Sequence, residues 1–196
     1  MLLKTLKCPH CGAPLKSKVK DHMLLCSSCG RISLFSNGNV GTVDFRIAKP
    51  GEKKPDETLV YVPFWIVNAT LDVKREKISG GKIRRAVKNE RQMRGTRDFY
   101  VCASDQVPEE YSRIWNMDLS LDQPSFETID AFKDGKREPM VVDEHVAENN
   151  AEFLFIRYET EIPGTLQELD YDFKVNSTKV LYLPAFKKDN NYKLGM

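Results

Sequence analysis

The chain has 196 residues, of which 41% are hydrophobic and 30% charged, and its formal net charge is +2. This is enough for one core-forming domain and a small module. No stretch approaches the roughly 20 apolar residues of a membrane span, and Met1–Lys4 is too short an apolar start for an export signal. We therefore expect a soluble, cytoplasmic protein with reduced thiols and no membrane partner.

Four of the five cysteines form two C-x-x-C-G motifs near the N-terminus. Cys8 and Cys11 make the first pair, Cys26 and Cys29 the second, and 14 residues separate Cys11 from Cys26. Each motif can turn two thiolates toward one point, and the glycine that follows permits the tight turn. Two such turns facing each other make the tetrahedral four-sulfur site that structural zinc prefers, although the usual gap is about 15–20 residues. The sequence predicts one structural zinc ion bound by these four cysteines.

The two motifs, within residues 1–36, resemble the zinc ribbon, a broad class of small metal-binding modules. The resemblance implies short antiparallel strands, which we expect at 13–19, 22–26 and 31–35, with a turn at Lys20-Asp21. Zinc ribbons commonly bind nucleic acid or contact partners in nucleic-acid machines, but many are only structural. The resemblance therefore implies a class of role and not one particular role.

The cysteines also admit other interpretations. A rubredoxin-like single iron uses the same four-sulfur geometry and stays the alternative to zinc. Two disulfides would require an oxidising compartment, and a thioredoxin-like pair would require a neighbouring βαβ unit. His10 and His22 lie close to the motifs, but four thiolates already complete a tetrahedron. We expect the fifth cysteine, Cys102, to be a buried, inert thiol.

The segment after the motifs combines turn signals with one short strand. Residues 36–41 are rich in turn-forming residues, 43–47 alternate apolar and polar side chains as in a strand, and 49–56 is a polar linker with two prolines. We therefore divide the chain into a zinc ribbon at 1–36, a short strand and linker at 37–57, and an α+β domain at 58–196.

Two apolar segments share a Tyr-aliphatic-Pro sequence. Residues 58–67 are rich in β-branched and aromatic side chains and predict a strand, in which Pro63 marks an edge position or a bulge. Residues 180–186 repeat the pattern, with Tyr182 and Pro184 in place of Tyr61 and Pro63. Chance similarity is one interpretation, and a duplicated half-domain with two equivalent strands is the other.

The other elements of the large domain follow from periodicity and turn signals. We expect a strand at 97–103, a helix beginning within 107–115, a loop at 118–126, a helix at 139–158, and a hairpin of 166–175 and 178–186 around Asn176-Ser177. Because strands and helices do not alternate regularly, the fold class is α+β, with a mainly antiparallel sheet and one or two helices.

Charge is unevenly distributed along the chain. Residues 1–35 hold six Lys or Arg and one acid, and residues 74–97 hold ten Lys or Arg and two acids. Residues 105–172 hold 18 acids and five Lys or Arg. The basic zones predict contacts with nucleic-acid phosphates, or else pairing with the acidic zone. The candidate phosphate-binding residues are Lys16, Lys18, Lys20, Arg31, Arg84, Arg85, Lys88, Arg91, Arg94 and Arg97.

No catalytic motif stands out. The chain has no phosphate-binding glycine loop, no G-x-S-x-G and no H-E-x-x-H, and His145 with Glu144 and Glu148 is the one histidine near carboxylates outside the cysteine motifs. Four thiolates also leave zinc no open coordination position. We therefore expect a binding protein, with no catalytic residue assigned, and keep a small-molecule enzyme as the third hypothesis.

The leading hypothesis is a metal-stabilised binding protein in which a structural zinc ribbon and a basic arm contact DNA or RNA. The alternative is a protein-interaction or assembly component, with the ribbon as scaffold and an acidic docking face. That alternative predicts exposed apolar surface around Tyr61, Phe64, Trp65 and Tyr182.

Overall fold

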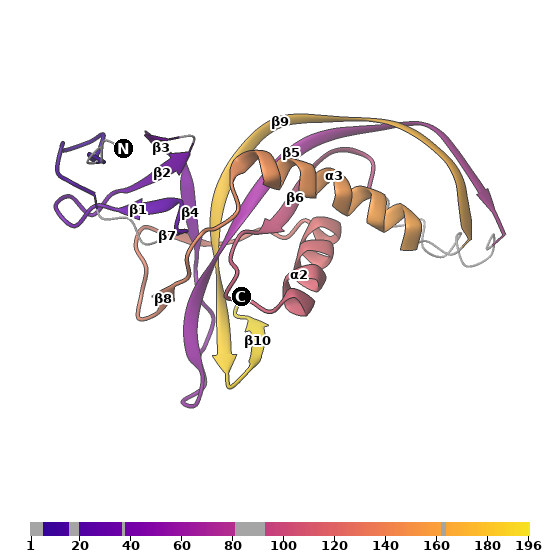
Figure 1. Cartoon of the computed structure of the whole chain (residues 1–196). Helices are drawn as coiled ribbons and strands as arrows, with labels where there is room; N and C mark the ends of the chain where they lie inside the picture. Colours follow the sequence, from indigo (N-terminus) through magenta and orange to yellow (C-terminus); the bar gives the residue numbers. More distant parts are fainter. Residues whose placement is uncertain (1–5, 16–19, 37, 81–92, 162–163) are drawn as a thin grey trace.

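Over the residues that the structure describes, the chain folds as α+β, with a small antiparallel sheet at the N-terminus and a larger mixed sheet carrying two helices (Figure 1). The computed structural model describes residues 6–15, 20–36, 38–80, 93–161 and 164–196. The small sheet has the order β1-β2-β3; the large one has the order β6-β5-β9-β4-β7, with β8 beside β5 and β10 beside β9. The elements are β1 (Met23–Leu25), β2 (Ile32–Ser36), β3 (Asn39–Thr42), β4 (Phe45–Ala48), β5 (Thr58–Ser79), β6 (Gly95–Cys102), α2 (Glu109–Asp122), β7 (Thr128–Ile129), β8 (Lys136–Arg137), α3 (Glu144–Glu161), β9 (Thr165–Lys188) and β10 (Asn191–Leu194).

The small sheet confirms two of its three expected strands. β1 and β2 match the predictions at 22–26 and 31–35, whereas the described part of 13–19 makes only an isolated bridge, between Lys7 and Pro14. The third strand is β3, so the stretch 36–41, which was expected to be rich in turns, has a turn at Gly38 and a strand from Asn39 onward. Asn37-Gly38 is a strong hairpin signal, and Gly38 adopts the left-handed φ of +76° that such turns require.

β4 confirms the short strand expected at 43–47, and it belongs to the large sheet, where it pairs in parallel with β9. The segment 37–57 therefore contributes β3 to one sheet and β4 to the other. The proposed three-part division of the chain stays a prediction.

β5 and β9 form the long central pair of the large sheet and curve over α3 (Figure 1). β5 begins at Thr58 as expected but continues to Ser79. The hairpin expected around Asn176-Ser177 is wrong, because β9 runs without a break through both residues. Asn176 is instead the extra residue of a register shift, and its Nδ2 donates to Asn68 Oδ1 at 3.1 Å and to Thr70 Oγ1 at 2.9 Å.

The prediction that Pro63 marks an edge or a bulge is also wrong. β5 is an interior strand with β9 on one flank, and the register shifts of this pair begin only at Asn68. On the other flank β8 pairs with residues 60–61 and β6 begins pairing at Phe64, so Pro63 lies where one neighbour ends and the next begins. The carbonyl of Pro63 accepts from Ala103 N at 2.9 Å, and the missing N–H of Pro63 leaves no acceptor unsatisfied, because the carbonyl of Ala103 accepts from Val141 N at 2.7 Å instead.

The Tyr-aliphatic-Pro segments of β5 and β9 are equivalent about a local twofold axis. Tyr61 pairs with Pro184, and Pro63 pairs with Tyr182. Each segment has a short parallel strand beside its tyrosine, β8 or β4, and an antiparallel strand after its proline, β6 or β10. The carbonyl of Pro184 accepts from Gly195 N, as that of Pro63 accepts from Ala103 N. This arrangement agrees with the expected pair of equivalent strands.

Alternate side chains of β5 are buried on opposite faces of the sheet. Tyr61, Trp65 and Val67 pack in the core that α3 covers, and Val62 and Phe64 pack in the core that Trp115 of α2 helps to close. Burial on both faces explains why residues 59–67 form a continuous apolar run. Exposure of Tyr61, Phe64, Trp65 and Tyr182 would have favoured the protein-interaction hypothesis, but these four aromatic residues are at most 2% exposed.

Both helices are confirmed, with shifted ends. α2 continues to Asp122, so the loop expected at 118–126 is wrong over its first five residues, because Leu119 and Ser120 are buried against the sheet. α3 begins at Glu144 instead of 139, because Asp143 Oδ1 accepts from Val146 N at 2.9 Å and so caps the helix.

Side chains of α2 take the place of a neighbouring strand along the outer edge of β6. The backbone N–H groups of Asp98, Tyr100 and Cys102 donate to side chains spaced along the helix at 2.8–3.0 Å. The acceptors are Gln123 Oε1, Ser120 Oγ and Asn116 Oδ1. The helix thus covers an edge that would otherwise be open to pairing with another chain.

Replacing Ser120 with alanine should lower the free energy of unfolding by about 1–3 kcal/mol, because the buried N–H of Tyr100 loses its acceptor. The change should appear as a lower urea midpoint with an unchanged m-value. Ser112→Ala on the same helix is the control, since its hydroxyl bonds to the carbonyl of Glu109 at the surface. Equal effects of the two substitutions would contradict this role for Ser120.

Candidate metal centre

The two cysteine motifs form matching turns. In each, the glycine N–H donates to the carbonyl of the first cysteine at 2.9 Å, Gly12 to Cys8 and Gly30 to Cys26. The two glycines have φ of +73° and +71°, a conformation that residues with a side chain rarely adopt. The glycine of each C-x-x-C-G motif is thus required by the turn that positions the two sulfurs.

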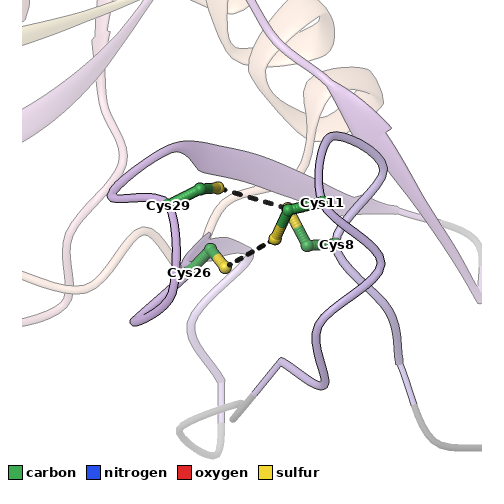
Figure 2. Close-up of side chains that lie close together, drawn as sticks. All are labelled: Cys8, Cys11, Cys26 and Cys29. Atoms are coloured by element: carbon green, nitrogen blue, oxygen red, sulfur yellow. Dashed lines mark hydrogen bonds between the residues drawn. The ribbon is translucent and has the colours of Figure 1, made fainter.

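The four sulfur atoms converge on one point between the turns, as Figure 2 shows. All lie within 4.8 Å of one another, and two contacts cross between the motifs, at 3.7 Å from Cys8 to Cys29 and 3.6 Å from Cys11 to Cys26. Sulfurs about 2.3 Å from a central ion at the corners of a tetrahedron lie about 3.8 Å apart. The thiols are free, so the predicted ligands form a cluster that could hold one metal ion.

Backbone amides favour the thiolate form at two of the cysteines. The N–H groups of Cys29 and Ser28 lower the pKa of Cys26 to about 6. Burial opposes ionisation of Cys8, yet the N–H groups of Cys11 and His10 leave its pKa lowered. At Cys11 the N–H of Ala13 favours the thiolate, but burial and the neighbouring sulfurs raise the pKa to about 12. A bound cation would relieve this repulsion among the sulfurs.

The nearby histidines are engaged outside the cluster. Nδ1 of His10 accepts from Nη1 of Arg31 at 2.9 Å, and Nδ1 of His22 donates to the carbonyl of Phe35 at 3.0 Å. The described cluster therefore consists of sulfur alone, in agreement with the predicted ligand set. A small core supports it, made of Cys8, Leu15, Leu24 and Cys26.

The residues predicted to contact nucleic acid are in three different situations. We call the described residues from 6 to 42 the N-terminal module. Lys20 and Arg31 are exposed on this module. Arg94 and Arg97 turn toward protein groups: Arg94 binds Glu159 and Glu76, and Arg97 donates to the carbonyls of Ser120 and Leu121. The other six, Lys16, Lys18, Arg84, Arg85, Lys88 and Arg91, lie outside the described residues.

Part of the basic zone pairs with the acidic zone. Lys74 Nζ lies 2.6 Å from Asp172 Oδ2, and Arg75 Nη1 lies 2.8 Å from Glu168 Oε1. These pairs link the outer parts of β5 and β9 and are exposed, so each contributes little to stability. They do neutralise two of the cations counted in residues 74–97.

The remaining candidates behave as ordinary structural residues. Cys102 is buried, and burial raises the pKa of its thiol to about 11, as expected for an inert cysteine. His145 is exposed on α3, where its Nδ1 lies 3.8 Å from Glu148 Oε2. Neither has the environment of a catalytic group.

Sequence reasoning missed a buried polar cluster between the N-terminal module and the large sheet. Asp21 is the one acid of residues 1–35, and its carboxylate lies 2.6 Å from Nη2 of Arg137 in β8. Arg137 also donates to Tyr182 Oη at 3.1 Å, and Asp21 accepts from Met140 N at 3.1 Å. We call Asp21, Arg137, Met140 and Tyr182 the seam. The feature of the sequence that pointed to this cluster was Asp21, because it is the one acid in an otherwise basic segment.

Comparison with known proteins yields no relative: the chain matches no protein-family model, no curated protein and no solved structure. Among the helices within the described ranges, none combines the length and apolar character needed to cross a bilayer.

Proposed function

We propose that the chain is a zinc-stabilised nucleic-acid-binding protein, in which a zinc ribbon presents basic side chains to phosphate groups. The observation that carries the proposal is the convergence of the four cysteine sulfurs in tetrahedral spacing. A complete set of four thiolates suits a structural ion rather than a catalytic one. Bound zinc would hold the two turns together, and the chain's own residues would make the contacts to the partner.

Charge supports phosphate as the partner group. The only acid in residues 1–35 is Asp21, which is buried and paired with Arg137, so it does not present a negative charge at the surface beside the described cations of that segment. Lys7, Lys20 and Arg31 are the described, exposed members of this basic set. Arg94 and Arg97 instead bind protein groups, so we assign phosphate contact to the N-terminal module and, as a prediction from sequence, to residues 84–91.

Replacing Lys20 and Arg31 together with glutamine should weaken binding to a mixed-sequence DNA or RNA oligonucleotide. The logarithm of the association constant should fall linearly with the logarithm of salt concentration, and each lost phosphate contact should reduce the slope by about 0.7–0.9. Fluorescence anisotropy over a series of salt concentrations measures both quantities.

Lys193→Gln on β10 is the control for the loss of a positive charge elsewhere on the protein, because Figure 1 places β10 away from the small sheet. It should leave the salt slope of binding unchanged. Binding that does not weaken steeply with salt, or a control that reduces it as much as the double substitution, would overturn the proposal for nucleic acid while leaving the metal site intact.

One observation favours a protein partner as the second candidate. Phe153 of α3 and Ile114 of α2 are 64% and 55% exposed, and a protein partner that covered them would remove this apolar area from water. Retention of oligonucleotide binding in Phe153→Ser, with loss of a protein complex, would assign that surface a separate role.

A further inference from the structure

One strand of the N-terminal module, β1, contributes side chains to two hydrophobic cores. In β1, Met23 points into the large core and its neighbour Leu24 points into the small core beside Cys8 and Cys26. Successive residues of a strand face opposite sides, so one short strand contacts both cores. Ile32 of β2 also lies in the large core. The position of β1 therefore affects the metal centre and the large sheet together.

Asp21, just before β1, fixes this strand to the large sheet. Its side chain is only 3% exposed and accepts hydrogen bonds from Met23 N at 3.0 Å and Met140 N at 3.1 Å. Arg137 supplies the neutralising charge, and it also donates to the carbonyl of Met23 at 3.2 Å. Every one of these contacts joins the segment 21–23 either to itself or to the segment 137–140.

Arg137 extends the connection to the middle of β9. Its Nη1 donates to Tyr182 Oη, and its guanidinium lies 6.0 Å from the centre of the Tyr182 ring. A backbone bond from His22 N to Met140 O, at 2.7 Å, runs beside these side-chain contacts. The seam thus reaches Tyr182, one of the paired residues at the local twofold axis of the sheet.

The N-terminal module has only a small core of its own. Its fully buried part consists of four residues, two of which are cysteines of the candidate metal centre, and Leu6, Ala13, Phe35 and Val40 pack partly buried against it. Modules with so few buried apolar side chains usually need a further stabilising element, and a structural metal supplies one through its binding energy. Loss of the ion would release the segment 21–23, and Arg137 would then be left in a largely buried position without its carboxylate.

We propose that the metal centre is coupled to the large sheet through the seam, so that metal occupancy controls the order of residues 137–140 and their contact with Tyr182. This inference rests on the proposed metal site but not on nucleic-acid binding. Coupling is reciprocal: if metal stabilises the seam, an intact seam must raise metal affinity by the same factor.

Hydrogen exchange of the full-length, zinc-loaded protein before and after treatment with a chelator tests whether metal occupancy controls the order of residues 137–140. Chelation should speed exchange of the Met140 and His22 amides at least about tenfold, because both donate across the seam. The amides of Tyr100 and Cys102, which bond to α2, are the internal reference and should keep their protection. Unchanged Met140 protection in protein shown to be metal-free would overturn the coupling.

The zinc affinity of variants altered in the seam tests the reciprocal effect, that an intact seam raises metal affinity. Asp21→Asn should weaken zinc binding about 5- to 150-fold, the usual range of coupling between sites. Tyr182→Phe keeps the ion pair and removes only the hydroxyl contact, so a smaller loss is expected and the variant serves if Asp21→Asn does not fold. Glu127→Gln, the same kind of change in the exposed pair with Lys49, should have no effect.

The outcomes separate the two proposals. Purified protein that never retains metal would remove the metal site itself. Protein that binds one zinc ion per chain, with the same affinity in Asp21→Asn and Tyr182→Phe as in the unaltered chain, would remove the coupling alone.

Discussion

Replacing Cys26 with serine should abolish stoichiometric metal binding and unfold the N-terminal module. Cys26 is 1% exposed, its Sγ lies 3.6 Å from that of Cys11, and backbone amides favour its thiolate. A serine hydroxyl stays protonated and cannot replace a thiolate ligand. Structural zinc sites contribute about 10–16 kcal/mol of binding free energy at neutral pH, so a module that depends on the ion has no comparable alternative.

Elemental analysis and amide spectra of the purified full-length protein measure the outcome. The unaltered chain should carry one zinc ion, and Cys26→Ser should carry a small fraction of one and lose the dispersed signals of residues in β1 and β2. Zinc is colourless, so a visible absorption band with iron in the elemental analysis would identify the alternative metal.

Cys102→Ser is the matched control, since it makes the same change at a buried thiol in β6. It should retain one ion per chain. Metal-free protein with an ordered module, or full metal retention in Cys26→Ser, would contradict the assignment of the four cysteines.

Replacing Arg137 with methionine should destabilise the zinc-loaded protein by about 3–5 kcal/mol. The substitution leaves the carboxylate of Asp21 buried with no cation, and breaking one side of a buried ion pair usually costs this much. The second variant, Asp21→Asn with Arg137→Met, should recover part of the loss, because it carries no buried charge. Denaturant unfolding of the single and double variants gives the coupling energy of the pair.

Lys188→Met is the control for the loss of a cation, because Lys188 pairs with Asp56 at the exposed end of β9. Its effect should stay below about 1 kcal/mol. If Arg137→Met were no more harmful than this surface change, the seam would be only a contact between two independently stable parts.

Local chemistry made the metal centre predictable. The four cysteines and their glycines lie within two five-residue motifs, and each turn follows from backbone conformations that the motif itself favours. The strand at 58–67 was predictable for a similar reason, since its apolar and β-branched content exceeds what a surface segment would carry. Such features depend on neighbours along the chain, which the sequence displays directly.

Features that depend on a pairing partner were misjudged. Asn176-Ser177 has the composition of a turn, yet it forms a bulge because β9 pairs with β5 on both sides of it. Pro63 has the composition of an edge residue, yet it lies in an interior strand at the junction between β8 and β6. In both cases the local sequence correctly indicated an irregularity in backbone hydrogen bonding. Whether that irregularity became a turn, a bulge or a junction between two neighbouring strands depended on the register of a distant strand.

The sequence by itself determined the four-cysteine cluster, the fold class and the basic character of the N-terminal module, because these follow from residue types and short spacings. Tertiary structure alone decided which charges face solvent. Asp21 and Arg137 lie 116 residues apart and neutralise each other in a buried contact, while Arg94 and Arg97 turn toward acceptors on other elements. Whether a charged side chain faces solvent or pairs within the protein depends on the groups that the fold brings next to it. Those groups come from distant parts of the sequence, so only the packing of the whole sheet places them.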